Sequence, residues 1–180
     1  MAAVLLISMA GAALASKSPA MQLGSGVYFE SSAMVEGFDL CIWGLKLDMR
    51  FNTLNGWFAF ETPTALGFDE DIVELSLEPS AMLSIPFGSQ LRLDGGIGTR
   101  MKVTLHTDGT WTVNGAGYES TGSAFKLMKP DYRIGMMFDL DALSVRFSSR
   151  IPTEGTFMKP DFSPDWDETE IGASILVDIA

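Results

Sequence analysis

The sequence is poor in cysteine, histidine and basic residues. Cys41 is its one cysteine, so no disulfide can form within the chain. His106 is its one histidine, which excludes histidine-rich metal sites and leaves few options for a general base. The 12 Lys and Arg face 23 Asp and Glu, for a net charge of −11. So acidic a chain is not expected to bind nucleic acid, because binding the phosphate backbone requires a basic surface.

The sequence also lacks an apolar run long enough for a transmembrane helix, which needs about 18 residues or more. The apolar run at residues 4–15 is shorter and ends in Ala13-Leu14-Ala15, a small-x-small pattern of the kind that signal peptidase cuts. We therefore predict a signal peptide at residues 1–15 and a single barrel domain at residues 16–180. The alternative for the run is a buried helix, because no Lys or Arg precedes it. If the domain enters a membrane, it must do so as strands.

Helical spacing is scarce beyond the apolar run, whereas apolar and polar residues alternate in long segments. Residues 41–51 show this most clearly. One face of this segment carries Cys41, Trp43, Leu45, Leu47, Met49 and Phe51, and the other carries Ile42, Gly44, Lys46, Asp48 and Arg50. A period of two residues predicts a β-strand with one face in an apolar environment.

Similar alternation predicts further strands along the rest of the chain. The clear ones are residues 73–87, 91–105, 143–148 and 170–179, and weaker ones are residues 21–30, 57–62 and 123–138. The links are expected to alternate between longer and short, at residues 31–38, 52–55, 63–71, 88–90, 107–122, 139–142 and 152–167. This rhythm is typical of an up-and-down membrane barrel. The sequence therefore predicts an all-β fold, an eight-stranded antiparallel up-and-down transmembrane β-barrel, with an uncertainty of one strand.

The polar faces of these strands carry charges of both signs. The interior of an eight-stranded barrel is only wide enough to be filled by side chains, and an unpaired charge buried there would cost several kcal/mol. We therefore predict a cluster of ion pairs in the lumen, with Asp178 on the same face of the last strand. The cluster consists of Lys46, Asp48, Arg50, Glu74, Glu78, Arg92, Asp94, Arg100, Lys102, Arg146, Arg150 and Glu170.

Strand length and the place of the acidic surplus favour a membrane barrel over a soluble one. Globular strands usually hold about 5–6 residues, and a tilted membrane strand needs about 9–11. The acidic surplus falls mostly in the expected long links, as at Asp69, Glu70 and Asp71. An acidic rim fits divalent cations that bridge to lipopolysaccharide, and a halophilic or marine source would explain it equally. The interpretation that we prefer is a solvated acidic loop without a specific ligand. A soluble secreted β-barrel that binds an apolar ligand with an inward apolar face is the alternative.

The chain resembles the small outer-membrane β-barrel family of the opacity and surface-protein type. It does so in the alternation of apolar and polar residues, in the alternation of short and longer loops, and in its closing strand at residues 170–179. The resemblance spans residues 21–179 and rests on architecture, without a diagnostic motif. Such barrels commonly end in an aromatic residue, where this sequence has Ala180. The resemblance implies that the chain is located in the outer membrane of a Gram-negative bacterium. Its implied partners are outer-membrane lipid, lipopolysaccharide and the barrel-assembly machinery.

No motif in the sequence assembles a catalytic, cofactor-binding or metal site, so we expect no enzyme. The sequence Gly95-Gly96-Ile97-Gly98 lies inside a strand pattern, where glycine allows close approach across a tight lumen. Some outer-membrane barrels are lipid A deacylases with a His-x-Ser pair, but here Asp108 follows His106 at the serine position. We expect a structural or surface-interaction role, with a lumen plugged by ion pairs and long loops that contact external proteins or surfaces. A narrow solute or ion channel is the alternative.

Overall fold

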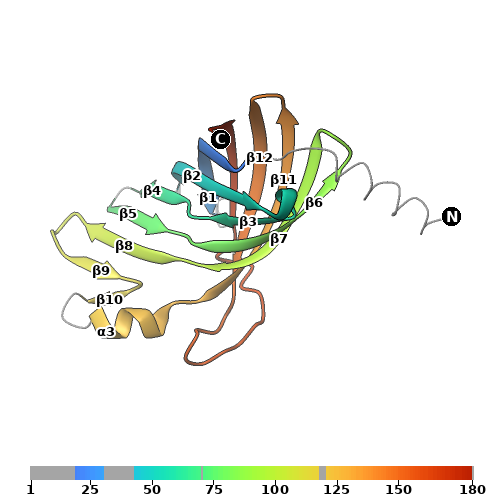
Figure 1. Cartoon of the computed structure of the whole chain (residues 1–180). Coiled ribbons are helices and arrows are strands. Elements are labelled where there is room, and N and C mark those ends of the chain that lie inside the picture. Colours follow the sequence, from blue (N-terminus) through green and yellow to red (C-terminus); the bar gives the residue numbers. More distant parts are fainter. Residues whose placement is uncertain (1–18, 31–42, 70, 118–120, 180) are drawn as a thin grey trace.

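A computed structural model describes residues 19–30, 43–69, 71–117 and 121–179. These residues form one antiparallel sheet, which closes on itself because its first strand, β1, pairs with both β2 and β13. Figure 1 shows the strands curving around a common axis. The predicted signal peptide, the expected link at residues 31–38 and Cys41 lie outside the described residues.

Eight runs of chain form the wall of the barrel, as predicted. Five are single strands: β1 (Met21–Glu30), β2 (Trp43–Thr53), β11 (Pro130–Leu140), β12 (Leu143–Pro152) and β13 (Glu170–Asp178). The other three each consist of two strands in line: β3 (Phe58–Glu61) with β4 (Thr64–Phe68), β5 (Ile72–Leu77) with β6 (Ser80–Phe87), and β7 (Leu91–Thr99) with β8 (Met101–His106). A small hairpin of β9 (Trp111–Val113) and β10 (Ala116–Gly117) extends the sheet beside β8.

The three interrupted strands break at about the same height of the wall. Two of the breaks lie at Pro63 and Pro79, because proline has no N–H to donate to the ladder. Backbone hydrogen bonds continue across them, from Glu78 N to Pro63 O at 2.9 Å and from Thr99 N to Pro79 O at 3.1 Å. The inward and outward faces keep their phase through each break, so the wall remains one surface.

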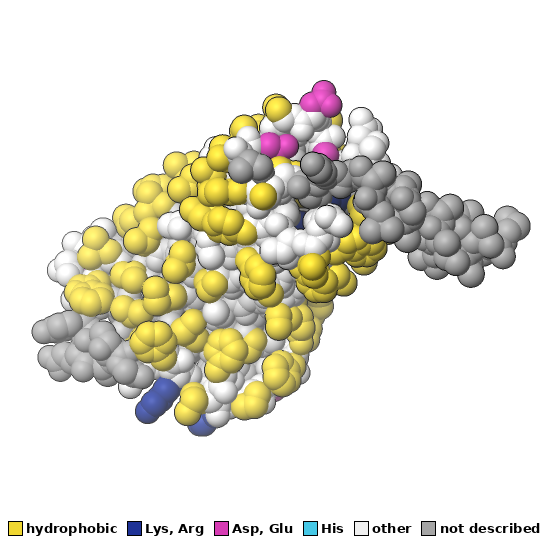
Figure 2. Space-filling view, in the orientation of Figure 1, with side chains coloured by type: hydrophobic (Ala, Val, Ile, Leu, Met, Phe, Trp, Pro, Cys, Tyr) yellow, Lys and Arg dark blue, Asp and Glu magenta, His cyan; other side chains and the backbone are white. Residues whose placement is uncertain are grey.

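The apolar face of the strands points outward. In β2, Leu45 and Leu47 are 53% and 59% exposed, whereas Lys46 between them is buried. Hydrophobic side chains spread over the visible outer surface in Figure 2, and the charged ones gather at its two ends. The alternative of a soluble barrel with an apolar interior is therefore wrong, because the polar face forms the interior.

The two ends of the barrel differ. One end, here called the turn end, has the short connections at residues 54–57, 88–90 and 141–142, the first of which contains η2 (Leu54–Gly56). The C-terminal end of β13 lies there too (Figure 1). The other end, here called the loop end, has the connections at residues 69–71, 107–129 and 153–169. Among the described residues, no helix has the length and apolar character to cross a membrane.

Two expected boundaries were wrong. The long link expected at residues 63–71 is short, because Thr64–Phe68 forms β4. The inward residues of this segment, Pro63, Ala65 and Gly67, are small or belong to types that are common in turns, so they did not indicate a strand. The strand expected at residues 123–138 begins only at Pro130, because the preceding chain forms α3 (Thr121–Ala124) and η4 (Phe125–Leu127). The link before β11 is correspondingly longer than expected.

Candidate functional site

Charged side chains of both signs fill the lumen. Among the described residues, seven cationic side chains are buried: Lys46, Arg50, Arg92, Arg100, Arg133, Arg146 and Arg150. Seven anionic ones are buried with them: Asp48, Glu61, Glu74, Glu78, Asp94, Asp131 and Glu170. The buried charges therefore balance, although the whole chain carries −11. The acidic surplus lies outside this buried set.

A first network occupies the middle of the lumen around Arg50. Its guanidinium donates to Glu61 Oε1 at 2.6 Å and, through two nitrogens, to both oxygens of Asp94 at 2.6 and 3.1 Å. Glu61 also accepts a hydrogen bond from Arg146 Nη2 at 2.6 Å. Ser84 donates to Asp94 Oδ1 at 2.6 Å. Asp48 is buried as well, and its Oδ1 has no hydrogen-bond partner among the described residues.

A second network lies nearer the loop end around Glu78 and Glu170. Lys46 Nζ lies 3.1 Å from Glu78 and 3.2 Å from Glu170. Arg100 joins the same two carboxylates, with Nη1 3.0 Å from Glu170 Oε2 and Nε 3.5 Å from Glu78 Oε1. Arg150 Nε lies 3.5 Å from Glu170 Oε2. Five of the eight runs of the wall are thereby linked through side chains, in addition to the backbone ladder.

Tyr28 fills the space beside this second network. Its side chain is fully buried, and its ring faces Lys46 Nζ at 5.7 Å and the guanidinium carbon of Arg100 at 6.0 Å. Both distances fit cation–π contacts. Tyr28 pairs with Gly44 on β2, where a Cβ would collide with the tyrosine ring and with the carbonyl oxygen of Leu66. Glycine is therefore required at position 44 to leave room for the ring.

The remaining predicted cluster residues lie toward the two ends. At the turn end, Arg92 makes two hydrogen bonds of 2.7 Å to Asp139. At the loop end, Lys102 Nζ lies 2.7 Å from Glu74 Oε1, and its side chain is 33% exposed. All twelve predicted residues face the interior, and Lys102 is the most exposed of them.

Two cavities of very different size lie among the lumen side chains of the described residues. The cavity between the two networks, lined by Lys46, Asp48 and Arg146 among others, measures about 10 Å³, which is about the space that one water molecule needs. Toward the loop end the lumen widens into a mouth of about 620 Å³, with Arg100, Lys102 and Arg150 in its lining. Among the described residues, the wider of these two cavities thus lies at the loop end.

The mouth is bordered by loop residues that form their own ion pairs. Lys129 Nζ donates to Glu168 at 3.1 Å and to Asp165 at 3.2 Å. Burial lowers the pKa of Lys129, but the two carboxylates outweigh burial and raise this pKa above its ordinary value. His106 also borders the mouth, at the end of β8. Within the described part of the chain, no group of three or more His, Cys, Asp or Glu is arranged to hold a metal ion.

Sequence reasoning missed three buried charges, namely Glu61, Asp131 and Arg133. Arg133 donates to Glu78 at 2.8 Å and to Asp131 at 2.7 and 2.9 Å, so it belongs to the second network. A signal for Arg133 was present, because Tyr132, Ile134, Met136 and Phe138 alternate with it. The signal for Glu61 was hidden by Trp57, which belongs to a turn and not to the strand that follows.

Comparison with solved structures defines the fold. The barrel resembles a de novo designed transmembrane β-barrel, with a TM-score of 0.53 and 10% identity over 90% of this chain and 98% of that one. It resembles Neisserial surface protein A, NspA, with a TM-score of 0.51 and 9% identity over 88% and 96% of the two chains. The N-terminal β-barrel domain of Pseudomonas aeruginosa OprF gives a TM-score of 0.51 and 8% identity over 88% and 97%.

The fold is that of a small outer-membrane β-barrel. Sequence comparison adds nothing to this, since no family model and no curated protein matches the chain. At 10% identity or less, the similarity concerns architecture and not residue roles. In a barrel of this fold the apolar outer face is the surface that lipid covers, and the lumen networks occupy the place where wider barrels have a channel.

Proposed function

We propose that the chain is a non-enzymatic outer-membrane barrel that presents its loop end to the exterior and does not conduct. The observation that supports the proposal is the set of balanced buried charges in the lumen, with a cavity of about 10 Å³ between their two networks. A hydrated ion cannot pass so small a space unless the networks around Arg50 and Glu78 separate. The barrel then serves as an anchor for what its loops contact.

The loop at residues 153–169 supports a surface-interaction role. Backbone hydrogen bonds order it, from Gly155 N to Asp161 O at 3.0 Å and from Glu154 N to Ser163 O at 2.9 Å. Despite this order it exposes large apolar side chains, including Met158 and Trp166. Exposed apolar side chains on an ordered loop are typical of a contact surface. Outer-membrane lipid, lipopolysaccharide or an external protein would meet this loop, and the barrel-assembly machinery would insert the chain.

Planar-bilayer recording tests the proposal. We expect no discrete current steps from the refolded chain, and we expect the Glu78→Ala and Arg100→Ala variants to remain as silent as the wild type if the other pairs keep the lumen closed. Steady single-channel current from the wild type would contradict a plugged lumen.

A narrow channel is the second candidate, and the mouth of about 620 Å³ favours it because a solute could enter that far. Under this reading the wild type conducts, and Glu78→Ala or Arg100→Ala changes the current or its ion selectivity. The same recordings therefore separate the two functions.

A further inference from the structure

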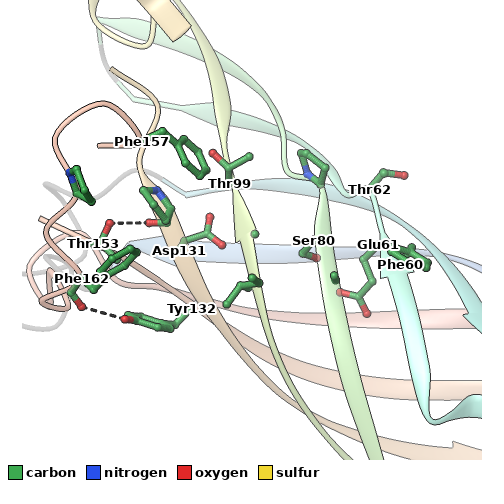
Figure 3. Close-up of a pocket in the computed structure, with 16 residues that line it drawn as sticks. Phe60, Glu61, Thr62, Ser80, Thr99, Asp131, Tyr132, Thr153, Phe157 and Phe162 are labelled. Atoms are coloured by element: carbon green, nitrogen blue, oxygen red, sulfur yellow. Dashed lines mark hydrogen bonds between the residues drawn. The ribbon is translucent and has the colours of Figure 1, made fainter. Parts of the chain in front are cut away.

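A hollow on the outer wall lies at the height where the strands break. It measures about 730 Å³, within the range of about 300–1,000 Å³ that is usual for ligand pockets. Strands β3, β6, β7 and β11 form its floor, and the loop at residues 153–169 forms one side (Figure 3). Apolar side chains dominate its lining.

The register of the sheet explains the hollow. Phe60, Ala81, Ile97 and Tyr132 are successive partners across four neighbouring strands, and all four face outward. Ala81 is the smallest of them, so the surface dips between Phe60 and Ile97. The adjacent outward row continues the dip toward the loop end with Pro79 and Thr99, which are also compact.

The loop at residues 153–169 closes one side of the hollow in a fixed position. Tyr132 Oη donates to Phe162 O at 2.9 Å, and Thr153 Oγ1 donates to Pro130 O at 3.0 Å, both drawn in Figure 3. Phe157 N donates to Met128 O at 3.1 Å. These bonds hold Phe157 and Phe162 beside the hollow, yet the two rings stay 55% and 64% exposed. The described part of the protein leaves them largely uncovered.

We infer that this hollow is a binding site for one acyl chain of a lipid from the surrounding bilayer. The inference rests on the proposed membrane location, because the hollow is continuous with the apolar outer face that lipid would cover. Hydrocarbon surrounds that face in a membrane, and an apolar hollow bordered by a fixed loop holds an acyl chain more tightly than a flat wall does. No Lys, Arg or His is among the described residues that line the hollow, so the site offers no cation to an anionic headgroup and selects hydrocarbon.

Native mass spectrometry of the full chain, refolded, reconstituted into phosphatidylglycerol vesicles and extracted with mild detergent, tests the inference. We expect the wild type to retain one phospholipid. Ala81→Trp should abolish retention by filling the floor of the hollow, while the lumen is untouched. Leu83→Trp is the matched control, because Leu83 is the next outward residue on β6 and does not line the hollow; it should retain the lipid. Phosphatidylcholine vesicles should give the same result.

Each other outcome overturns the inference. Equal retention by Ala81→Trp and wild type would show that lipid binds elsewhere on the wall. A dimer mass without lipid would assign the hollow to a second copy of the chain. A folded wild type without any retained lipid, with its heat-dependent gel shift intact, would refute the lipid site alone. Loss of that gel shift in the wild type would instead refute the proposed membrane barrel itself.

Discussion

Arg50 and Asp94 form a bidentate ion pair across the lumen, with N–O distances of 2.6 and 3.1 Å. They lie on β2 and β7, which are separated in the sheet by β3 and β6. Both side chains are fully buried, at 0% exposure. The pair therefore joins two strands that backbone hydrogen bonds do not join, and neither side chain is exposed to solvent.

Removing one member of this pair should destabilise the barrel strongly. Arg50→Met leaves Asp94 buried without its cation, and we expect a loss of about 3–5 kcal/mol in the free energy of unfolding. Urea unfolding in micelles measures this loss of stability, with the intensity of the folded band on gels as the readout. Lys129→Met is the control, because Lys129 and its partner Glu168 are 31% and 59% exposed, and the loss of such an exposed pair should cost about 1 kcal/mol or less. The double variant Arg50→Met with Asp94→Leu should recover much of the loss, since no buried charge is left unpaired. Equal losses for Arg50→Met and Lys129→Met would contradict this role.

A charge placed on the outer face should destabilise the barrel only in lipid-like surroundings. Leu45 is 53% exposed on β2, and an arginine at mid-membrane costs about 2–4 kcal/mol. Leu45→Arg should therefore lower stability in phospholipid vesicles by about that amount. Phe125→Arg, at a residue that is 65% exposed and lies outside the wall in η4, should change stability little. If both variants unfold at the wild-type urea concentration, the outer face does not meet lipid.

The strands with strict alternation could be predicted from sequence, and the irregular ones could not. In β2, charged and apolar residues alternate from Trp43 to Phe51, so the pattern alone separates the lumen from the outer face. In β4 the inward positions hold Ala65 and Gly67, which give no hydrophobic contrast. Their identity as strand residues depends on pairing with β2 and β5, and a single-sequence pattern does not show such pairing.

For the site, sequence indicated which face each charge occupies but not which charges meet. Arg133 pairs with Glu78 across 55 positions of sequence, and Arg146 with Glu61 across 85. Such contacts follow from the stagger of strands around the closed barrel. The hollow beside Ala81 also follows from this stagger, because it needs Phe60 and Tyr132 to lie in one row.

Two neighbouring glycines on β7 should respond differently to a methyl group. At Gly96 an added Cβ would meet the carbonyl oxygen of Ala81 and the sulfur of Met82, whereas at Gly95 nothing lies within 4 Å. We expect Gly96→Ala to destabilise the barrel by about 1–3 kcal/mol through overpacking. Gly95→Ala, on the outer face, should be neutral or slightly stabilising. Urea midpoints of the two variants decide this, and a larger loss at Gly95 would reverse the assignment of faces.

The turn between β8 and β9 should weaken at low pH. Thr110 donates to Asp108 Oδ1 through its hydroxyl at 2.6 Å and its N–H at 2.8 Å, which holds the pKa of Asp108 below its ordinary value. A lowered pKa in the folded state gives a stabilisation that is complete above the ordinary aspartate pKa of about 3.9 and is lost as the pH falls through the lowered value.

Carboxyl NMR titration in micelles checks this pH dependence. Thr110→Val should move the pKa of Asp108 upward by removing the hydroxyl donor. Thr107→Val, an exposed threonine in the same turn, should leave it in place. An unchanged titration in Thr110→Val would show that the hydroxyl does not set this pKa.

The central claim is that the apolar outer face is covered by lipid and the charged face forms a filled interior. The most direct test is to refold the chain from Ser16 onward into detergent micelles and compare its gel migration with and without boiling. The account predicts a compact band that shifts on heating, because the closed barrel resists detergent until it is boiled. A chain that folds and stays monodisperse in plain buffer, with no shift on heating, would contradict it.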